Sequence, residues 1–180
     1  MWRGRASGLA RPPILTGAIL ALSVVSAAVL GVTFAGTPGR PAGDWLLVGR
    51  SEAGEILLRV PLPDSSFALR YRNSVYDSLA EERFRVDATG RLVLAELASD
   101  EVALLGEYYD VARRPRRAPL SDARDWVAPP ARHTALEELP LIASQHGERA
   151  LLVEGRRPVP LWSLAGTETA TITLAAEKDR

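Results

Sequence analysis

Residues 67–86 read FALRYRNSVYDSLAEERFRV, and their hydrophobic alternation decides the fold class. Apolar side chains occupy every second position in Phe67–Tyr71 and again in Phe84–Val86, which is the period of a β-strand with one buried face. Ser78–Glu81 also matches a helix capping box, but the residues behind it, ERFRV, keep the period of two. The stretch therefore predicts two strands joined as a hairpin.

The same period recurs on both sides of this hairpin, in Ile56–Val60, Leu92–Leu94 and Ala170–Leu174. Three apolar runs are further strand candidates: DWLLV from Asp44, ALLVE from Ala150 and PLWSL from Pro160. Outside one apolar stretch near the N-terminus, no window has the long amphipathic pattern of a helix. We expect an all-β domain, either a single β-sandwich or a partly open barrel of short antiparallel strands.

The register of the hairpin predicts a polar cluster on the inner face of the sheet. If paired residue numbers sum to 155, the apolar face continues into Asn73 opposite Glu82. In the next hairpin, Gly90 suits the left-handed position of a three-residue loop. Paired residue numbers in that hairpin then sum to 178, which places Glu82 opposite Glu96. We therefore expect Asn73, Glu82 and Glu96 to form an inner polar cluster.

Two carboxylates that face each other repel, and burial raises the pKa of the less compensated one. Such a cluster is a candidate cation or proton site, or a pair for acid–base catalysis. The alternative is that the row lies at the open end of the sheet, where water and Asn73 satisfy it.

The same register places four arginines on the outer face, with Arg70 opposite Arg85 and Arg72 opposite Arg83. Like charges that face each other destabilise a sheet unless an anion compensates them. An acidic partner, a phosphate-bearing ligand or lipid headgroups would do so functionally, and neighbouring acids would do so structurally.

A second basic group lies in an irregular, proline-rich stretch between residues 110 and 130. It consists of Arg113, Arg114, Arg116 and Arg117 around Pro115, which predicts an exposed, extended loop. This loop is either a second surface for an anionic partner or a solvated connection balanced by nearby acids, namely Glu107, Asp110, Asp122 and Asp125.

The N-terminal part of the chain predicts a membrane anchor. Ile14–Ala35 contains no charged residue, and a helix of this length is about 33 Å long, enough to span a bilayer. Arginines precede it at positions 3, 5 and 11, which places the N-terminus in the cytoplasm and the rest of the chain outside it. The alternative is a signal sequence cleaved after Ala35, which would release the domain.

These features divide the chain into five parts: a basic cytoplasmic N-terminus (1–13), a transmembrane anchor or signal sequence (14–35), a flexible tether (36–44), an extracytoplasmic β-domain (45–176) and a charged tail (177–180). One transmembrane helix thus precedes the β-domain.

The composition excludes several function classes. Twenty-two basic against twenty-two acidic side chains give no net charge, unlike a nucleic-acid-binding protein, and the absence of cysteine excludes disulfides and thiol chemistry. A zinc site would need His133, His146 and a carboxylate together. No nucleotide-binding or hydrolase motif is present, and we expect no metal and no cofactor.

Residues 67–86 resemble the signature of a bacterial family, domain of unknown function 1850, whose pattern is close to Y-x-H-S-V-x-x-T-P-V-x-E-x-F. Five residues fit it directly and Ser78 stands for its threonine; the five are Tyr71, Ser74, Val75, Glu82 and Phe84. Asn73 replaces the family histidine, and Leu79-Ala80 replaces Pro-Val. With asparagine there, the histidine–glutamate pair that the family pattern suggests cannot act as an acid–base or metal-binding couple.

The family has no established activity, but its genes often lie beside those of TRAP-type transporters with a TAXI-class receptor. The resemblance therefore implies an accessory role at a transporter in the bacterial cytoplasmic membrane. We expect a single-pass protein whose extracytoplasmic domain is a binding or assembly module, with transporter subunits as partners. The alternatives are an extracytoplasmic enzyme that uses Glu82 and Glu96, or a structural envelope protein.

Overall fold

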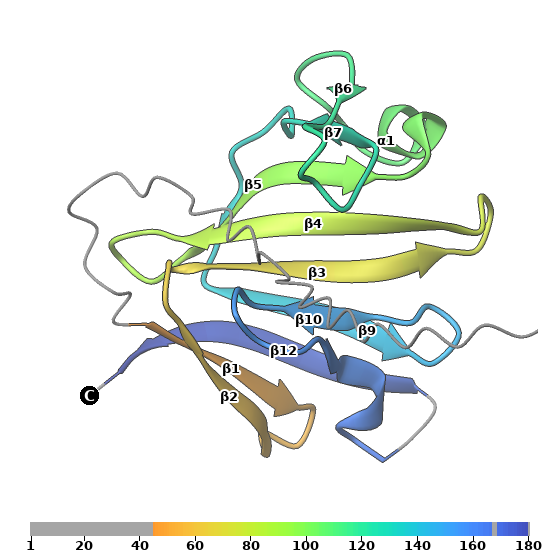
Figure 1. Cartoon of the computed structure of the whole chain (residues 1–180). Helices are drawn as coiled ribbons and strands as arrows, with labels where there is room; N and C mark the ends of the chain where they lie inside the picture. The colour runs from red at the N-terminus through yellow and green to blue at the C-terminus, as the bar shows by residue number, and fades with distance from the viewer. Residues whose placement is uncertain (1–44, 167–168, 180) are drawn as a thin grey trace, which may run out of the picture. The chain divides into compact units, whose positions relative to one another are not determined.

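Two antiparallel β-sheets pack face to face in the part of the chain that the computed structural model describes, residues 45–166 and 169–179 (Figure 1). The first sheet has the order β2-β1-β12-β9, with β1 at Trp45–Ser51, β2 at Ile56–Leu62, β9 at Glu138–Ser144 and β12 at Thr169–Lys178. The second has the order β11-β10-β3-β4-β5-β7-β6, and β8 also pairs with β5. Its strands are β3 Ser66–Asn73, β4 Ser78–Val86, β5 Leu92–Ser99, β6 Arg116–Arg117, β7 Trp126–Ala128, β8 Ala135–Leu136, β10 Ala150–Leu152 and β11 Val159–Pro160. The expected all-β sandwich is confirmed.

The main core lies between the two sheets, because alternate residues of each strand point inward. Leu47 and Leu174 from the first sheet and Leu69 from the second are fully buried in it. The rings of Phe67 and Phe84, paired across β3 and β4, stack with their centroids 5.1 Å apart. The alternation that predicts the strands therefore also supplies the core.

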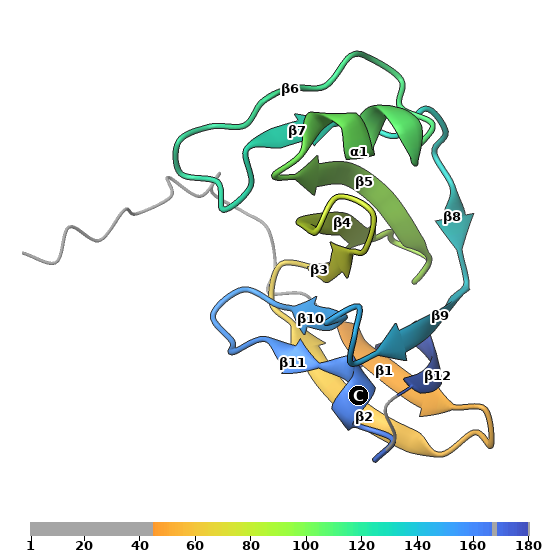
Figure 2. The ribbon, with the colours of Figure 1, turned by 90° about the vertical axis from the view of Figure 1, so that its right-hand side faces the viewer.

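A second, smaller core lies under the short helix α1 (Val102–Glu107), which packs on β5 and β7 (Figure 2). It contains Leu97, Leu105 and Ala128. The Glu101 carboxylate caps the helix by accepting a hydrogen bond from the Ala103 amide at 3.1 Å. This helix has no clear signal in the sequence, because six residues are too few to establish a helical period.

The expected loop between β4 and β5 is confirmed. Gly90 has φ +90°, and Val86 pairs with Leu92, as the sum of 178 requires. A side chain at position 90 would meet the ring of Trp45, since a Cβ atom there would lie 2.9 Å from it. Position 90 therefore requires glycine for two independent reasons.

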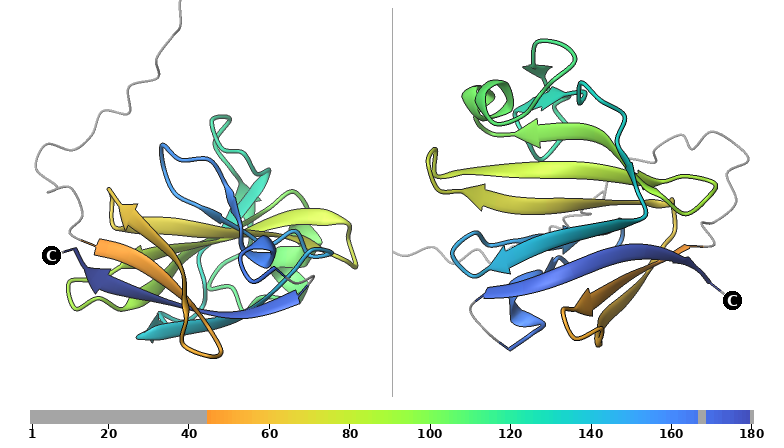
Figure 3. Two further views of the ribbon diagram at one scale, coloured as in Figure 1. Left: turned by 90° about the horizontal axis from the view of Figure 1, so that it is seen from below. Right: turned by 180° about the vertical axis from the view of Figure 1, so that it is seen from behind.

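Three expectations about element boundaries are wrong. The PLWSL run is not a strand along its length, because Leu161–Ser163 forms a 3₁₀ turn after β11. β12 continues to Lys178, which pairs with Trp45 at the start of β1, so the sheet extends into the tail expected from residue 177 (Figure 3). The stretch 110–130 contains the short strands β6 and β7.

The predicted anchor at 14–35 and the tether at 36–44 lie outside the described residues. Among the described residues, no helix has the length and apolar character needed to cross a membrane.

Candidate functional site

The expected inner cluster is not assembled, because the β3–β4 hairpin is tighter than its predicted register. Pairs in this hairpin sum to 151, so Asn73 faces Ser78, and Glu82 faces Leu69. The Asn73 side chain instead shapes the turn, since its Oδ1 accepts hydrogen bonds from the amides of Val75 at 3.0 Å and Tyr76 at 3.1 Å. Asn73 is therefore a turn-forming residue in this structure.

A β-bulge separates the two carboxylates of the expected cluster. The β4–β5 register shifts between Arg83 and Phe84, so that Glu82 pairs with Leu97, and Glu96 pairs with Arg83. The extra residue on β5, Ala95, reverses the alternation and turns Glu96 to the outer face. Glu82 stays on the inner face, so the two carboxylates do not form a pair.

Glu82 belongs instead to a chain of hydrogen bonds at the inner face. The Tyr109 hydroxyl, just after α1, donates to Glu82 Oε1 at 2.9 Å, and it lies 2.5 Å from the Tyr71 hydroxyl. The guanidinium of Arg149 lies over the Tyr71 ring, 5.1 Å from its centroid. Because the Tyr109 hydroxyl donates its hydrogen bond to Glu82, the Tyr71 hydroxyl donates to the Tyr109 oxygen.

The tyrosine chain holds its phenols in the neutral form. Burial raises the pKa of Tyr109, and the nearby Glu82 charge raises it further. Burial also raises the pKa of Tyr71. Neither phenol is therefore a phenolate nucleophile or base near neutral pH, and the arrangement fixes α1 to the sheet.

A pH dependence of stability follows from this chain. The folded state keeps the Tyr71 and Tyr109 protons, whereas the unfolded state releases them from about pH 10. We expect the free energy of unfolding to be unaffected by these groups below pH 10 and to fall as the pH rises above it, by up to about 1.4 kcal/mol per pH unit for Tyr109. Urea unfolding of wild type, Tyr109→Phe and the exposed control Tyr108→Phe between pH 8 and 11 measures this. A slope in Tyr109→Phe as steep as in the control contradicts it.

The four outer arginines lie on one face, as expected, but they do not face one another. Arg70 faces Glu81, Arg83 faces Ala68, and Arg85 faces Ser66; Arg72 faces Leu79. Arg72 makes ion pairs with Asp77 at 3.2 Å and Glu148 at 3.1 Å. Among the described residues, the side chains of Arg70 and Arg85 make no hydrogen bond or ion pair.

Arg83 is the centre of a half-buried ion cluster. Its guanidinium donates two parallel hydrogen bonds to Asp122, at 2.7 and 2.8 Å, and further bonds to Glu81 at 3.0 Å and Glu96 at 2.9 Å. The hydrogen bond to Asp122 raises the pKa of Arg83, and the same contact lowers the pKa of Asp122. The neighbouring acids therefore compensate this arginine.

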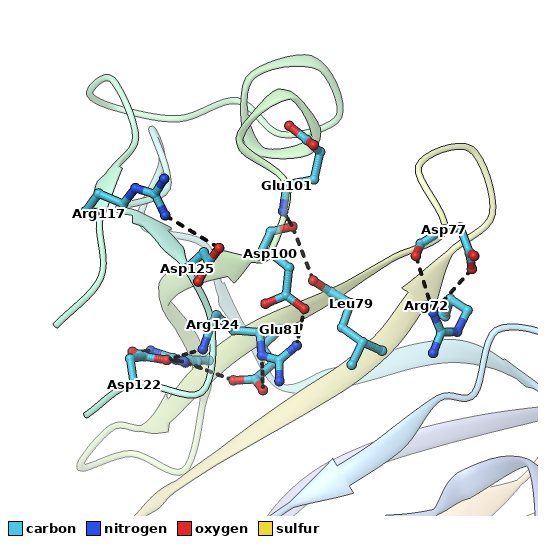
Figure 4. Close-up of polar contacts among 12 residues, drawn as sticks. Arg72, Asp77, Leu79, Glu81, Asp100, Glu101, Arg117, Asp122, Arg124 and Asp125 are labelled. Atoms are coloured by element: carbon cyan, nitrogen blue, oxygen red, sulfur yellow. Dashed lines mark hydrogen bonds and ion pairs between the residues drawn. The ribbon is translucent and has the colours of Figure 1, made fainter. Parts of the chain in front are cut away.

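The loop between β6 and β7, residues 118–125, completes the cluster (Figure 4). Arg124, whose side chain is 11% exposed, pairs with Glu81 at 3.3 Å and with Asp100 at 2.6 Å. This loop thereby covers part of the outer face of β4 and β5. Arg124 and the contact between Asp122 and Arg83 were not predicted from the sequence. No local pattern links this loop to β4, which lies about forty residues earlier in the chain.

Next to this cluster, the outer face is hollowed into a depression of about 640 Å³, which we call the outer groove. Its lining combines small apolar side chains with charged ones: Ala68, Ala95, Leu152, Arg85, Glu96 and Glu154. Arg85 is exposed at its edge with no side-chain partner among these residues, so its charge is available to a ligand.

The second basic group is exposed, as expected, and half of it is compensated. Arg117 lies over the Trp126 ring at 4.3 Å and pairs with Asp125 at 3.5 Å, and Arg116 lies 3.8 Å from Glu96. Arg113 and Arg114 make no ion pair with any described residue. Most of this loop is thus a solvated connection held to β7.

The described residues contain no cluster of three or more acidic or histidine side chains able to hold a metal ion. No protein family, no curated protein and no solved structure matches the chain. Function is therefore inferred from the geometry of the site.

Proposed function

We propose that this chain is a membrane-anchored, extracytoplasmic binding module that holds a partner protein in the outer groove. The observation that carries the proposal is the groove itself, an open depression whose apolar floor is bordered by the unpaired Arg85. An apolar centre inside a polar, solvent-accessible rim is the usual arrangement of a protein-binding surface, and arginine is enriched in such surfaces. The matching partner presents small apolar residues beside an acidic one.

The chemistry of the described residues favours binding over catalysis. Glu82 and Glu96 lie on opposite faces of the sheet, so the carboxylate pair on which the enzymatic alternative depends is not formed. The phenols beside Glu82 are held neutral, and Arg83 is fully engaged by acids. Among the residues that the structure describes, the feature that remains available to another molecule is the outer groove with the unpaired Arg85 at its edge.

The uncharged segment 14–35 supports placement on the outer side of the bacterial cytoplasmic membrane, and cleavage after Ala35 would give a secreted form of the same module. The resemblance of residues 67–86 to domain of unknown function 1850 supports a partner among the subunits of a TRAP-type transporter. Both points extend the proposal beyond the described residues.

Affinity capture of the full chain, cross-linked in its native membrane, tests this function. Arg85→Glu reverses the free charge of the groove, and we expect recovery of the partner to fall about tenfold, the equivalent of about 1.4 kcal/mol. The matched control is Arg59→Glu, an exposed arginine of β2 in the other sheet, which should leave recovery unchanged. Recovery of transporter subunits supports the accessory role. Recovery of a different partner contradicts only the accessory role at a transporter. Equal recovery from both variants contradicts the proposal that the outer groove binds the partner.

A further inference from the structure

The two margins of the sandwich differ. At one margin β8, directly before β9, pairs with β5 and links the two sheets. At the other margin, β2 is the edge strand of the first sheet and β11 is the edge strand of the second. Within the described residues, no strand pairing joins β2 to β11. A pocket of about 240 Å³ lies at this open seam, which we call the seam pocket.

The inner wall of the seam pocket is the main core itself. Its apolar lining includes Leu151, which is fully buried, and Val60 and Val153, each 7% exposed. Val159 of β11 is half-buried at the same pocket. All four belong to or pack against the core between the sheets, so an apolar group entering here would extend that core.

The mouth of the seam pocket carries two uncompensated cations. Arg156 and Arg157 line it and are exposed, in a tight turn closed by the Arg156 amide donating to the Val153 carbonyl at 3.1 Å. Neither guanidinium makes a hydrogen bond or an ion pair with any described residue. The acid of the same turn, Glu154, interacts with Asp64, which raises the pKa of Glu154.

We propose that the seam pocket binds a small amphipathic anion. Its apolar tail lies against Val60, Leu151 and Val153, and its carboxylate or phosphate head is held by Arg156 and Arg157. Guanidinium groups bind both heads through paired, charge-assisted hydrogen bonds. The volume lies below the range of about 300–1,000 Å³ typical of drug-sized ligands, which limits the tail to a short chain.

This inference is independent of the outer groove, because the two pockets share only Val153. It is tested on the Gly36–Arg180 chain, which contains every described core residue and therefore its own hydrophobic core. The probes are octanoate and octyl phosphate, with octanol and octyltrimethylammonium as neutral and cationic analogues. Methyl NMR spectra of valine and leucine report on the pocket residues directly.

We expect both anions to shift the methyl signals of Val60, Leu151, Val153 and Val159 saturably, and to bind about tenfold more tightly than octanol. The double variant Arg156→Gln with Arg157→Gln should bind the anions about tenfold more weakly and should bind octanol with unchanged affinity. Arg114→Gln, an exposed arginine without an ion-pair partner among the described residues, is the matched control and should have no effect.

Binding of only one of the two anions supports the site and identifies the head as carboxylate or phosphate. Because exposed arginines are replaced, the double variant should fold, and unchanged methyl signals outside the pocket verify this. Equal binding of the cation and the anions, shifts elsewhere in the core, or an equal loss in Arg114→Gln each overturn the proposal.

Discussion

Replacing Arg83 with alanine is expected to lower the free energy of unfolding by about 3 kcal/mol. The substitution leaves Glu81, 6% exposed, and Asp122, whose side chain is 13% exposed, without their shared cation. Removing the shared cation is costly because these two carboxylates, which are the most buried ones of the half-buried cluster, stay desolvated. The loop at residues 118–125 also loses the two bonds between Asp122 and Arg83 and keeps the Arg124–Glu81 ion pair to β4, so its Asp122 end should become more mobile.

Urea unfolding of the Gly36–Arg180 chain measures the effect of Arg83→Ala. Arg85→Ala is the matched control, since Arg85 is on the same strand and face, and it should change stability by less than about 0.5 kcal/mol. The lowered pKa of Asp122 stabilises the folded state above about pH 4, and this contribution disappears as the pH falls further. The variant should therefore lose less stability on acidification than wild type. Equal stabilities of Arg83→Ala and Arg85→Ala contradict this account of the cluster.

Leu174→Ala should be still more destabilising, by about 3–4 kcal/mol, because it opens a cavity in the main core. Leu174 is fully buried in the middle of β12, opposite Gly49 and Leu139. Its side chain packs over Gly49, where a Cβ would lie 3.3 Å from Leu174 Cδ2. The space that glycine leaves is thus filled by Leu58, whose Cδ2 would lie 2.9 Å from such a Cβ, and by Leu174.

The midpoint of urea denaturation measures the loss in Leu174→Ala, with Ile142→Ala as its control. Ile142 lies on the adjacent strand β9 and is 66% exposed, so its truncation should cost less than about 0.5 kcal/mol. A loss in Leu174→Ala below 1 kcal/mol would mean that the two sheets do not share one tightly packed core.

The strands and their faces could be predicted from the sequence, because the alternation of apolar residues determines both. The outer arginines are on the predicted face even though the β3–β4 register is wrong. The predicted sum of 155 and the observed sum of 151 are both odd, and a shift by an even number of residues keeps every side chain on its face.

The candidate site could not be predicted, because its geometry depends on features with no periodic signature. In the structure Asn73 pairs with Ser78, so the β3–β4 loop consists of residues 74–77. The predicted register, which pairs Tyr71 with Phe84 and Asn73 with Glu82, would leave a loop longer by four residues. The bulge at Ala95 then moves Glu96 to the other face. Glu82 is correctly placed on the inner face, but its partner Tyr109 comes from a separate segment after α1.

The ion cluster shows the same limit. The predicted register places Arg83 opposite Arg72 and for that reason indicates that it needs an anion. In the structure Arg83 faces Ala68, and the anions within reach on neighbouring positions of the sheet are Glu81 and Glu96. Asp122 and Arg124 arrive from a loop whose path depends on tertiary packing. The sequence therefore identifies the need for compensation, and only the structure identifies its source.

Site-specific photo-cross-linking from the outer groove tests the central claim most directly. p-Benzoylphenylalanine in place of Ser66, which lines the groove on β3 opposite Arg85, leaves the Arg85 charge in place. It is compared with the same group in place of Thr171, an exposed position of β12 on the other sheet, both in the full chain in its native membrane. The account predicts one discrete adduct to a membrane or extracytoplasmic protein from position 66 and none from position 171. No adduct from position 66, or the same adduct from both positions, would contradict it.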